Sequence, residues 1–281
     1  MISQLTGAGL RALLVVAMIV TPSLLLPQDA PEVADAVILI AFCAAVFTVL
    51  EYGAIYPGLV EFRDAPPFNR TRFAILALTV LMIAGICAGR EEPSALSRLV
   101  FAVGVMLGHA MDFPWSPIRL ILWLLPEGTT MAEAQIVRAA AGLAYLVALV
   151  GITLFAILIR LYRWPGRSGA FNVWINLPTF EPTAGADVVR RLRSDGRFNI
   201  LLGIVLPYLS PPVAGFVGGV NGISLIESDL VLVWSVALWA FLPASLFLRG
   251  IAMRRLALMI EAKRRRVAVD HAAVGTDFLP A

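Results

Sequence analysis

Residues 101–123 read FAVGVMLGHAMDFPWSPIRLILW. They place three ionisable side chains, those of His109, Asp112 and Arg119, within one of the most apolar parts of the chain. An ionisable group at membrane depth is costly, so it usually faces protein or water and often has a function. Two prolines also interrupt the stretch, and a helix normally ends or kinks at such residues. The path of the chain here therefore decides how many times it crosses a membrane.

The rest of the chain is equally apolar. Of its 281 residues, 59% are hydrophobic and 15% are charged, and the mean hydropathy is +0.85. A soluble domain is about 45–50% apolar and about 25% charged. The apolar residues come in long blocks, an arrangement that distinguishes membrane spans from an ordinary core. The sequence therefore predicts an all-α fold, a polytopic membrane helix bundle with about seven spans.

Seven apolar segments are near the required length, since about 20 helical residues cross the roughly 30 Å of hydrocarbon in a bilayer. The first resembles a signal peptide, but PQDAPE after it lacks a small-x-small cleavage site, so we expect a retained helix. A further stretch, Ile118–Leu125, is too short to cross alone. The seven segments are Leu10–Leu26, Val33–Tyr56, Phe73–Gly89, Leu96–Asp112, Gln135–Leu161, Phe198–Val220 and Asp229–Leu248.

The distribution of arginine predicts the orientation. Of the 22 basic residues, all but Lys263 are arginine. Short cytoplasmic loops carry the excess of basic residues, and the two basic clusters lie in 160–197 and 249–266. We therefore expect both clusters and the carboxyl terminus in the cytoplasm of a bacterial cell. The acidic turn NGISLIESD, residues 221–229, would lie outside the inner membrane.

The proline-broken segment leaves two arrangements of the amino-terminal half. If Leu96–Leu125 is a re-entrant hairpin, the chain makes six full crossings and its amino terminus is inside. If Leu96–Asp112 crosses once, the chain makes seven crossings and its amino terminus is outside. The charge count favours the hairpin, and an eight-crossing version has the same sidedness. The basic residues left outside are Arg90, Arg98, Arg119 and Arg138 in the first arrangement, and Arg11, Arg63, Arg70, Arg72, Arg119 and Arg138 in the second.

The chain divides into four parts on this interpretation. Membrane helices occupy 1–162 and include the Pro-broken segment 96–126. A cytoplasmic interfacial segment with a short basic helix follows over 163–197. A membrane helix hairpin over 198–250 and a basic cytoplasmic C-terminal tail over 251–281 complete the chain.

The segment 163–197 has the signals of a short helix. Thr183 can cap its start, Asp187 and Arg191 can pair at i,i+4, and Gly196 can close it. This helix would lie along the inner leaflet, or the segment would be an ordered loop packed on the bundle. The aromatic residues expected at headgroup level are Trp164, Phe171, Trp174 and Phe180.

The sixth span contains Pro207, Pro211 and Pro212, so we expect a kinked or split helix. Such breaks free backbone carbonyl groups, which bind ions or substrate in some transporters. More often, neighbouring helices and waters satisfy the freed groups. The prolines alone do not distinguish a transport pathway from a packed kink.

His109 and Asp112 are three residues apart, so on a helix they share one face. The pair could relay protons, hold a metal with help from elsewhere, or ligate a tetrapyrrole through the imidazole. The plainer interpretation is that Asp112 caps the broken helix and His109 bonds to a neighbour. For Glu51, near the end of the second span, we expect a structural ion pair with Arg63, Arg72 or an arginine of another helix.

Two further patterns concern packing and lipid. Glycines four residues apart let helix backbones approach closely, within this chain or against a partner. Clustered basic residues attract the anionic inner leaflet of a bilayer. The glycine pairs are Gly85/Gly89, Gly104/Gly108 and Gly215/Gly219. The inner-leaflet basic residues are Arg190, Arg191, Arg193, Lys263, Arg264, Arg265 and Arg266.

The function expected from these observations is largely set by what the sequence lacks. It contains no GK[ST] phosphate loop, HExxH, GxSxG or CxxC motif, and it indicates no cofactor, metal or nucleic-acid partner. We expect a non-catalytic membrane subunit or assembly factor that contacts other membrane proteins. The alternatives are a small transporter or channel that uses the sixth span and the His109/Asp112 region, and a membrane enzyme acting on lipid or isoprenoid.

Overall fold

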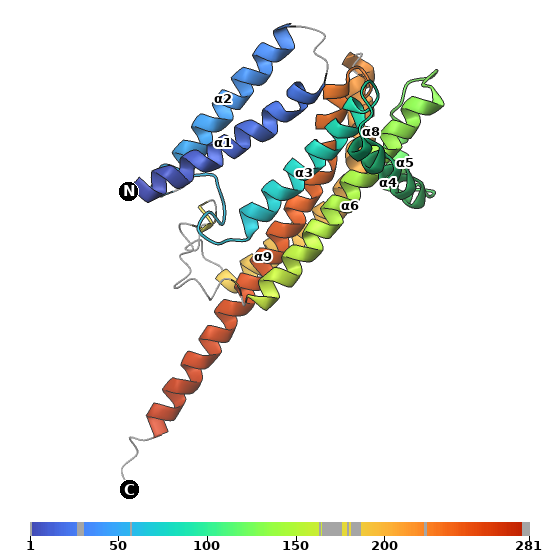
Figure 1. The fold of residues 1–281 in the computed structure, drawn as a ribbon. Helices are drawn as coiled ribbons and strands as arrows, with labels where there is room; N and C mark the ends of the chain where they lie inside the picture. Colours follow the sequence, from blue (N-terminus) through green and yellow to red (C-terminus); the bar gives the residue numbers. More distant parts are fainter. Residues whose placement is uncertain are drawn as a thin grey trace.

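The chain folds into helices over the residues that the structure describes, with no strand among them. The computed structural model describes residues 2–26, 31–56, 58–162, 164, 176–178, 180, 187–221 and 224–276. The helices are α1 (Ile2–Leu25), α2 (Pro31–Gly53), α3 (Phe68–Ala88), α4 (Ala95–Met111), α5 (Pro117–Leu122), α6 (Met131–Leu161), α8 (Val188–Asn221) and α9 (Asp229–Thr276). Their arrangement is shown in Figure 1.

Six of the described helices, α1, α2, α3, α6, α8 and α9, are long and apolar enough to cross a membrane. Helix α4 is apolar but has only 17 residues. The prediction of an all-α polytopic membrane helix bundle is therefore confirmed, with six long helices and one short apolar helix. The protein is a multi-pass membrane protein whose outer helix faces contact lipid.

Helices α3, α6, α8 and α9 form the body of the bundle, and α1 and α2 form a hairpin at its side (Figure 1). Helix α1 joins the hairpin to α3, and α2 packs on α1. The core lies where α3, α6 and α9 meet, with Val80, Val137 and Val233 fully buried. Small residues of α6, such as Ala140 and Ala144, let the neighbouring helices approach closely.

The contacts of the loop between α2 and α3 define one end of the bundle. The backbone N–H of Phe62 donates to the carbonyl of Asn176 at 2.6 Å, and the Trp164 indole donates to the carbonyl of Ala65 at 3.2 Å. Arg249 of α9 pairs with Glu61 of the same loop. We call this end, which contains residues 58–67, 164 and 249, the basic end. Residues 58–67 therefore lie on the same side as Trp164 and Asn176.

The other end of the bundle receives both ends of the proline-broken segment. Arg90, after α3, pairs with Asp229 at the start of α9 at 2.9 Å, and Glu133 of α6 lines a cavity with both residues. We call this end, with residues 89–94 and 224–229, the far end. Because α3 ends here and α6 begins here, the segment between them leaves and returns to one end. This geometry matches the re-entrant and eight-crossing arrangements, which share it, and does not fit a single crossing by Leu96–Asp112.

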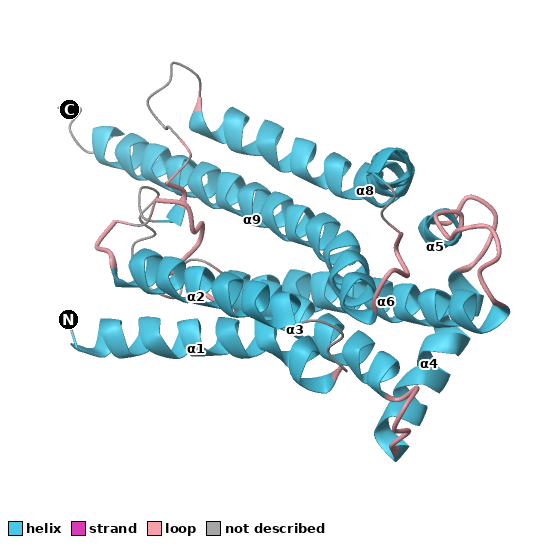
Figure 2. Ribbon diagram, turned by 90° about the horizontal axis from the view of Figure 1, so that it is seen from above, coloured by secondary structure: helices cyan, strands magenta, loops and turns pink. Residues whose placement is uncertain are grey.

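Helix α4 lies across the far end of the bundle rather than along it. Its apolar residues pack on Ile86 near the end of α3 and on Ala139 and Leu143 in the third and fourth turns of α6. Figure 2 shows α4 at an angle to the long helices, with the short α5 close to the end of α8. The segment thus forms a cap at one end of the bundle.

Helix α8 is longer than the sequence indicates. The prediction that Gly196 closes a short basic helix is wrong, because α8 runs from Val188 to Asn221 through that glycine. A Cβ atom on Gly250 of α9 would lie 2.6 Å from the carbonyl oxygen of Gly196, so the two glycines mark a close crossing of α8 and α9. Thr183, Phe171 and Trp174 lie outside the described residues.

The other two aromatic residues of the 163–197 segment are buried inside the protein. Trp164 is 4% exposed and packs against Phe62 and Phe155, and Phe180 is 5% exposed beneath the guanidinium of Arg191. These two side chains therefore belong to the core, and the prediction that they lie at headgroup level is wrong for them. The loop alternative, in which this segment packs on its own bundle, describes these two residues.

Helix α9 also continues beyond the expected span. It comprises 48 residues and includes most of the predicted tail, 251–281, as one helix up to Thr276. Figure 1 shows its carboxyl-terminal half extending past the other helices. Met253, Leu256 and Ala257 are still buried against the bundle, whereas every residue from 262 to 268 is exposed.

Candidate functional site

Asp112 is the centre of an ion cluster at the far end. It is the C-cap residue of α4, its side chain is 7% exposed, and its carboxylate accepts hydrogen bonds from Arg119 and Arg138. The Arg138 contact is 3.0 Å, and Arg119 also donates to the carbonyl of Asp112 at 3.2 Å. Ser116 caps α5 by accepting from the N–H of Arg119 at 3.0 Å. One carboxylate thus ties α4, α5 and α6 together.

His109 takes no part in this cluster through its side chain. It is exposed on α4, and its imidazole has no hydrogen bond or ion pair with any residue that the structure describes. Its carbonyl accepts from the N–H of Asp112 at 3.3 Å, which closes the last turn of the helix. The structure therefore brings together Asp112 and Arg119, but not the imidazole of His109. No metal-binding group of three His, Cys, Asp or Glu residues occurs in the described ranges.

Two of the predicted glycines allow α4 to sit directly on α6. A Cβ atom on Gly108 would lie 2.5 Å from the carbonyl oxygen of Arg138, and one on Gly104 would lie 3.0 Å from that of Ala139. Gly89 faces Ser97, and Gly215 faces the side chain of Leu124, whereas a Cβ on Gly85 would meet nothing within 4 Å. Gly219 lies in α8.

The proline-rich part of α8 remains one helix, and Figure 2 shows that it bends towards its carboxyl-terminal end. Pro211 has no N–H to donate to the carbonyl of Pro207, four residues earlier. The indole N–H of Trp239 on α9 donates to that carbonyl instead, at 3.2 Å. Trp239 is held in place by stacking on Tyr145, with ring centroids 5.8 Å apart. The freed carbonyl is thus satisfied by a neighbouring helix.

We expect Trp239→Phe to lower the free energy of unfolding by about 1–3 kcal/mol, because it leaves a buried carbonyl without a donor. Phenylalanine keeps an aromatic ring opposite Tyr145, so the loss reports mainly on the hydrogen bond. Denaturant titration of the purified protein in mixed micelles measures the change. Trp234→Phe, in the same helix, is the control, and equal effects of the two substitutions would contradict the assignment.

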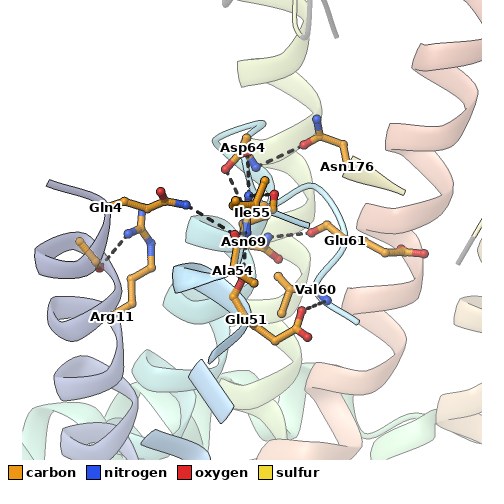
Figure 3. Close-up of polar contacts among 12 residues, drawn as sticks. Gln4, Arg11, Glu51, Ala54, Ile55, Val60, Glu61, Asp64, Asn69 and Asn176 are labelled. Atoms are coloured by element: carbon orange, nitrogen blue, oxygen red, sulfur yellow. Dashed lines mark hydrogen bonds and ion pairs between the residues drawn. The ribbon is translucent and has the colours of Figure 1, made fainter. Parts of the chain in front are cut away.

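Glu51 lies at the basic end and stabilises the turn that follows α2. Its carboxylate accepts the backbone N–H groups of Gly58, Leu59 and Val60 at 3.2, 3.0 and 2.9 Å. Arg63 donates to the backbone carbonyls of Glu51 and Ala54 at 2.9 and 2.6 Å, not to the carboxylate. Glu51 and Arg63 therefore both bind the loop backbone, and Figure 3 shows Glu51 beside Val60.

An ion pair at the basic end joins the loop to the last two helices. Arg249 donates to both carboxylate oxygens of Glu61, at 2.6 and 2.8 Å, and to the side chain of Asn199 at 3.2 Å. Asn69 donates to the carbonyl of Glu61 at 2.8 Å, as drawn in Figure 3. The bidentate geometry fixes the position of Arg249 more firmly than a single contact would. Sequence reasoning missed this pair, although Asn199 and Arg249 stand out as polar residues near span ends.

Part of the predicted inner-leaflet basic set is paired within the chain. Arg193 binds Glu261, Arg265 binds the same carboxylate, and Arg264 binds Asp187 at 2.7 Å. The hydrogen bond from Arg264 holds the pKa of the Asp187 carboxyl below its ordinary value. Lys263 and Arg266 are exposed and form no ion pair within the described part of the chain.

Comparison of the chain with protein-family models, with curated proteins and with solved structures found no match. The class of protein is therefore defined by the fold alone. It is a polytopic helical membrane protein with an ion cluster at each end of its bundle.

Proposed function

We propose that the protein is a non-catalytic integral membrane subunit or assembly factor of a larger complex in a bacterial inner membrane. The observation that carries the proposal is the part of α9 that projects past the other helices, residues 262–276, which we call the projecting half. A helix of 48 residues is about 72 Å long at 1.5 Å per residue, more than twice the roughly 30 Å of bilayer hydrocarbon. The carboxyl terminus and the basic end would face the cytoplasm, where the arginine excess belongs.

The projecting part of α9 has the properties of a helix that binds a partner. Residues 262–268 are exposed, and an isolated helix of 12–15 residues is marginally stable in water. Its net charge is positive, because residues 263–266 carry four basic side chains and Asp270 is the one acidic residue of 262–276. A partner subunit with an acidic surface would stabilise this helix. The anionic inner leaflet would attract the same residues.

The polar clusters give less support to transport or catalysis. The carbonyl freed by Pro211 already binds Trp239, and the carboxylate of Asp112 already binds two arginines. An ion or substrate would have to displace these contacts. The exposed His109 lies outside the cluster, so the geometry does not pair it with Asp112 as acid and base.

Crosslinking from the projecting helix tests the proposal. A photo-reactive residue at Arg266 should give a crosslink to one defined protein of the membrane fraction, and the same residue at Ile40, exposed on α2, should not. Native gels after mild detergent extraction should show a complex well above 30.3 kDa. Truncation after Glu261 should reduce this complex to the single chain without lowering its melting temperature. Migration of the full chain as a lone polypeptide would contradict the proposal.

A further inference from the structure

A cavity of about 520 Å³ lies at the basic end, between the α1–α2 hairpin, the following loop, α3 and α9. Figure 3 shows this region, with Arg11 on the side of α1 that faces the loop. Four arginines line it, and no acidic residue is among its described lining residues. The four arginines are Arg11, Arg63, Arg70 and Arg72.

The arginines differ in how far they are already bound. Arg63 is engaged with backbone carbonyls and with Asp64. Arg11 donates to the carbonyl of Gly7 at 2.7 Å and lies 4.7 Å above the ring of Tyr52. Arg70 is exposed and has no hydrogen bond or ion pair with a described residue. Arg70, and the guanidinium nitrogens of Arg11 other than the Nη1 atom bound to Gly7, are thus available to a ligand.

Arg72 is the most informative of the four. Its guanidinium lies between two aromatic rings, 5.5 Å from the centroid of Phe68 and 5.7 Å from that of Phe241. Its Nε atom is buried and has no hydrogen-bond partner, and the other guanidinium nitrogens form no hydrogen bond or ion pair with the described residues. A buried charged donor without an acceptor is costly unless something else supplies one.

The carboxylates near the cavity do not supply that acceptor. Glu51 is held by three backbone N–H groups, Glu61 by Arg249, and Asp64 by Arg63. The cavity therefore keeps an excess of positive charge within a largely apolar site. An anion with several oxygen acceptors, such as a phosphate group, satisfies guanidinium groups of this kind best.

The remaining walls of the cavity are those of a site for an apolar chain. Leu14, Val15, Phe47 and Leu76 come from three different helices and continue from the arginines into the membrane-spanning part. The volume lies within the range of sites that enclose a small molecule, about 300–1,000 Å³. Basic pockets between membrane helices hold anionic lipid headgroups in this way.

We propose that this cavity binds a phosphate-bearing lipid. Arg11, Arg70 and Arg72 bind its phosphate oxygens, and its hydrocarbon chain lies along Leu14, Phe47 and Leu76. The same arginines would also attract a free phosphate, but only a lipid fills both the charged and the apolar part of the cavity. The site is separate from the projecting half of α9, so it does not depend on the proposed partner.

Lipid titration of the delipidated protein in detergent tests the proposal. Phosphatidylglycerol should raise the melting temperature, while phosphatidylcholine and inorganic phosphate should leave it nearly unchanged. Arg70→Gln together with Arg72→Gln should weaken phosphatidylglycerol binding by about tenfold or more, the order expected when charge-assisted hydrogen bonds are lost. Arg160→Gln is the matched control, because Arg160 is an exposed arginine of the basic end outside the cavity.

Two precautions make the result decisive. Arg70→Gln alone changes an exposed side chain and should fold normally, so it must weaken binding even if the double variant is unstable. Native mass spectrometry counts the lipid retained by each variant independently of melting. Parental affinity in Arg70→Gln, an equal response to phosphatidylcholine, or a full response to inorganic phosphate without lipid would each overturn the proposal.

Discussion

Asp112→Ala is expected to lower the free energy of unfolding by about 3 kcal/mol, because it removes the carboxylate that binds two partly buried arginines. We take the lower end of the range for a broken buried ion pair, since the Arg119 side chain is 38% exposed and water can reach it. The variant also loses the ionic link that joins α5 to α6, and keeps the apolar contacts of Ile118 and Ile121. We therefore expect the far end to loosen as a unit.

Denaturant titration in mixed micelles measures this effect, and protease sensitivity of the segment between α4 and α6 locates it. Glu127→Gln is the control, because Glu127 is exposed in the same region and has no ion pair with a described residue. A destabilisation of Asp112→Ala no larger than that of Glu127→Gln would show that the cluster does not hold the cap together.

Gly108→Ala is expected to displace α4 from α6 and to cost about 1–3 kcal/mol, the usual range for overpacking. The new methyl group would lie 2.5 Å from the carbonyl oxygen of Arg138, and a backbone atom cannot move aside as a flexible side chain can. The shift would also separate Asp112 from Arg138, so the ion cluster would weaken with the packing.

Gly85→Ala is the matched control, since its methyl group would meet nothing within 4 Å. Replacing a helical glycine by alanine without a clash is expected to stabilise by roughly 0.5–1 kcal/mol. The two substitutions should therefore change the melting temperature in opposite directions. A Gly108→Ala variant as stable as the parent would mean that α4 does not pack as described.

The fold class could be predicted from the sequence, because apolar blocks of about 20 residues indicate membrane-spanning helices, in which the backbone polar groups bond to one another. The positions at which the helices contact one another are predicted less well by the sequence. Gly104 and Gly108 were identified by their spacing, yet Gly85 belongs to the same pattern and faces open space. The spacing shows which helix faces lack large side chains, but it does not show which of these faces another helix contacts.

Features that join distant parts of the chain could not be predicted from local patterns. Glu61 and Arg249 are 188 residues apart, and no local sequence pattern around either residue indicates that the two form an ion pair. Gly196 was predicted to end a helix because glycine is common just after the last helical residue. It instead lies within α8, where its small size allows the close approach of Gly250 on α9. Tertiary packing overrides a local signal in this case.

We expect residues 58–67 and 249–266 to lie on one side of the membrane, and both ends of the 89–130 segment to lie on the other. Single cysteines at Asp64, Lys263, Glu92 and Glu127, in a protein whose Cys43 and Cys87 are replaced by alanine, test it with an impermeant maleimide. In intact cells, Glu92→Cys and Glu127→Cys should be labelled, and Asp64→Cys and Lys263→Cys should react only after permeabilisation. Opposite labelling of Glu92→Cys and Glu127→Cys, or of Asp64→Cys and Lys263→Cys, would contradict the account.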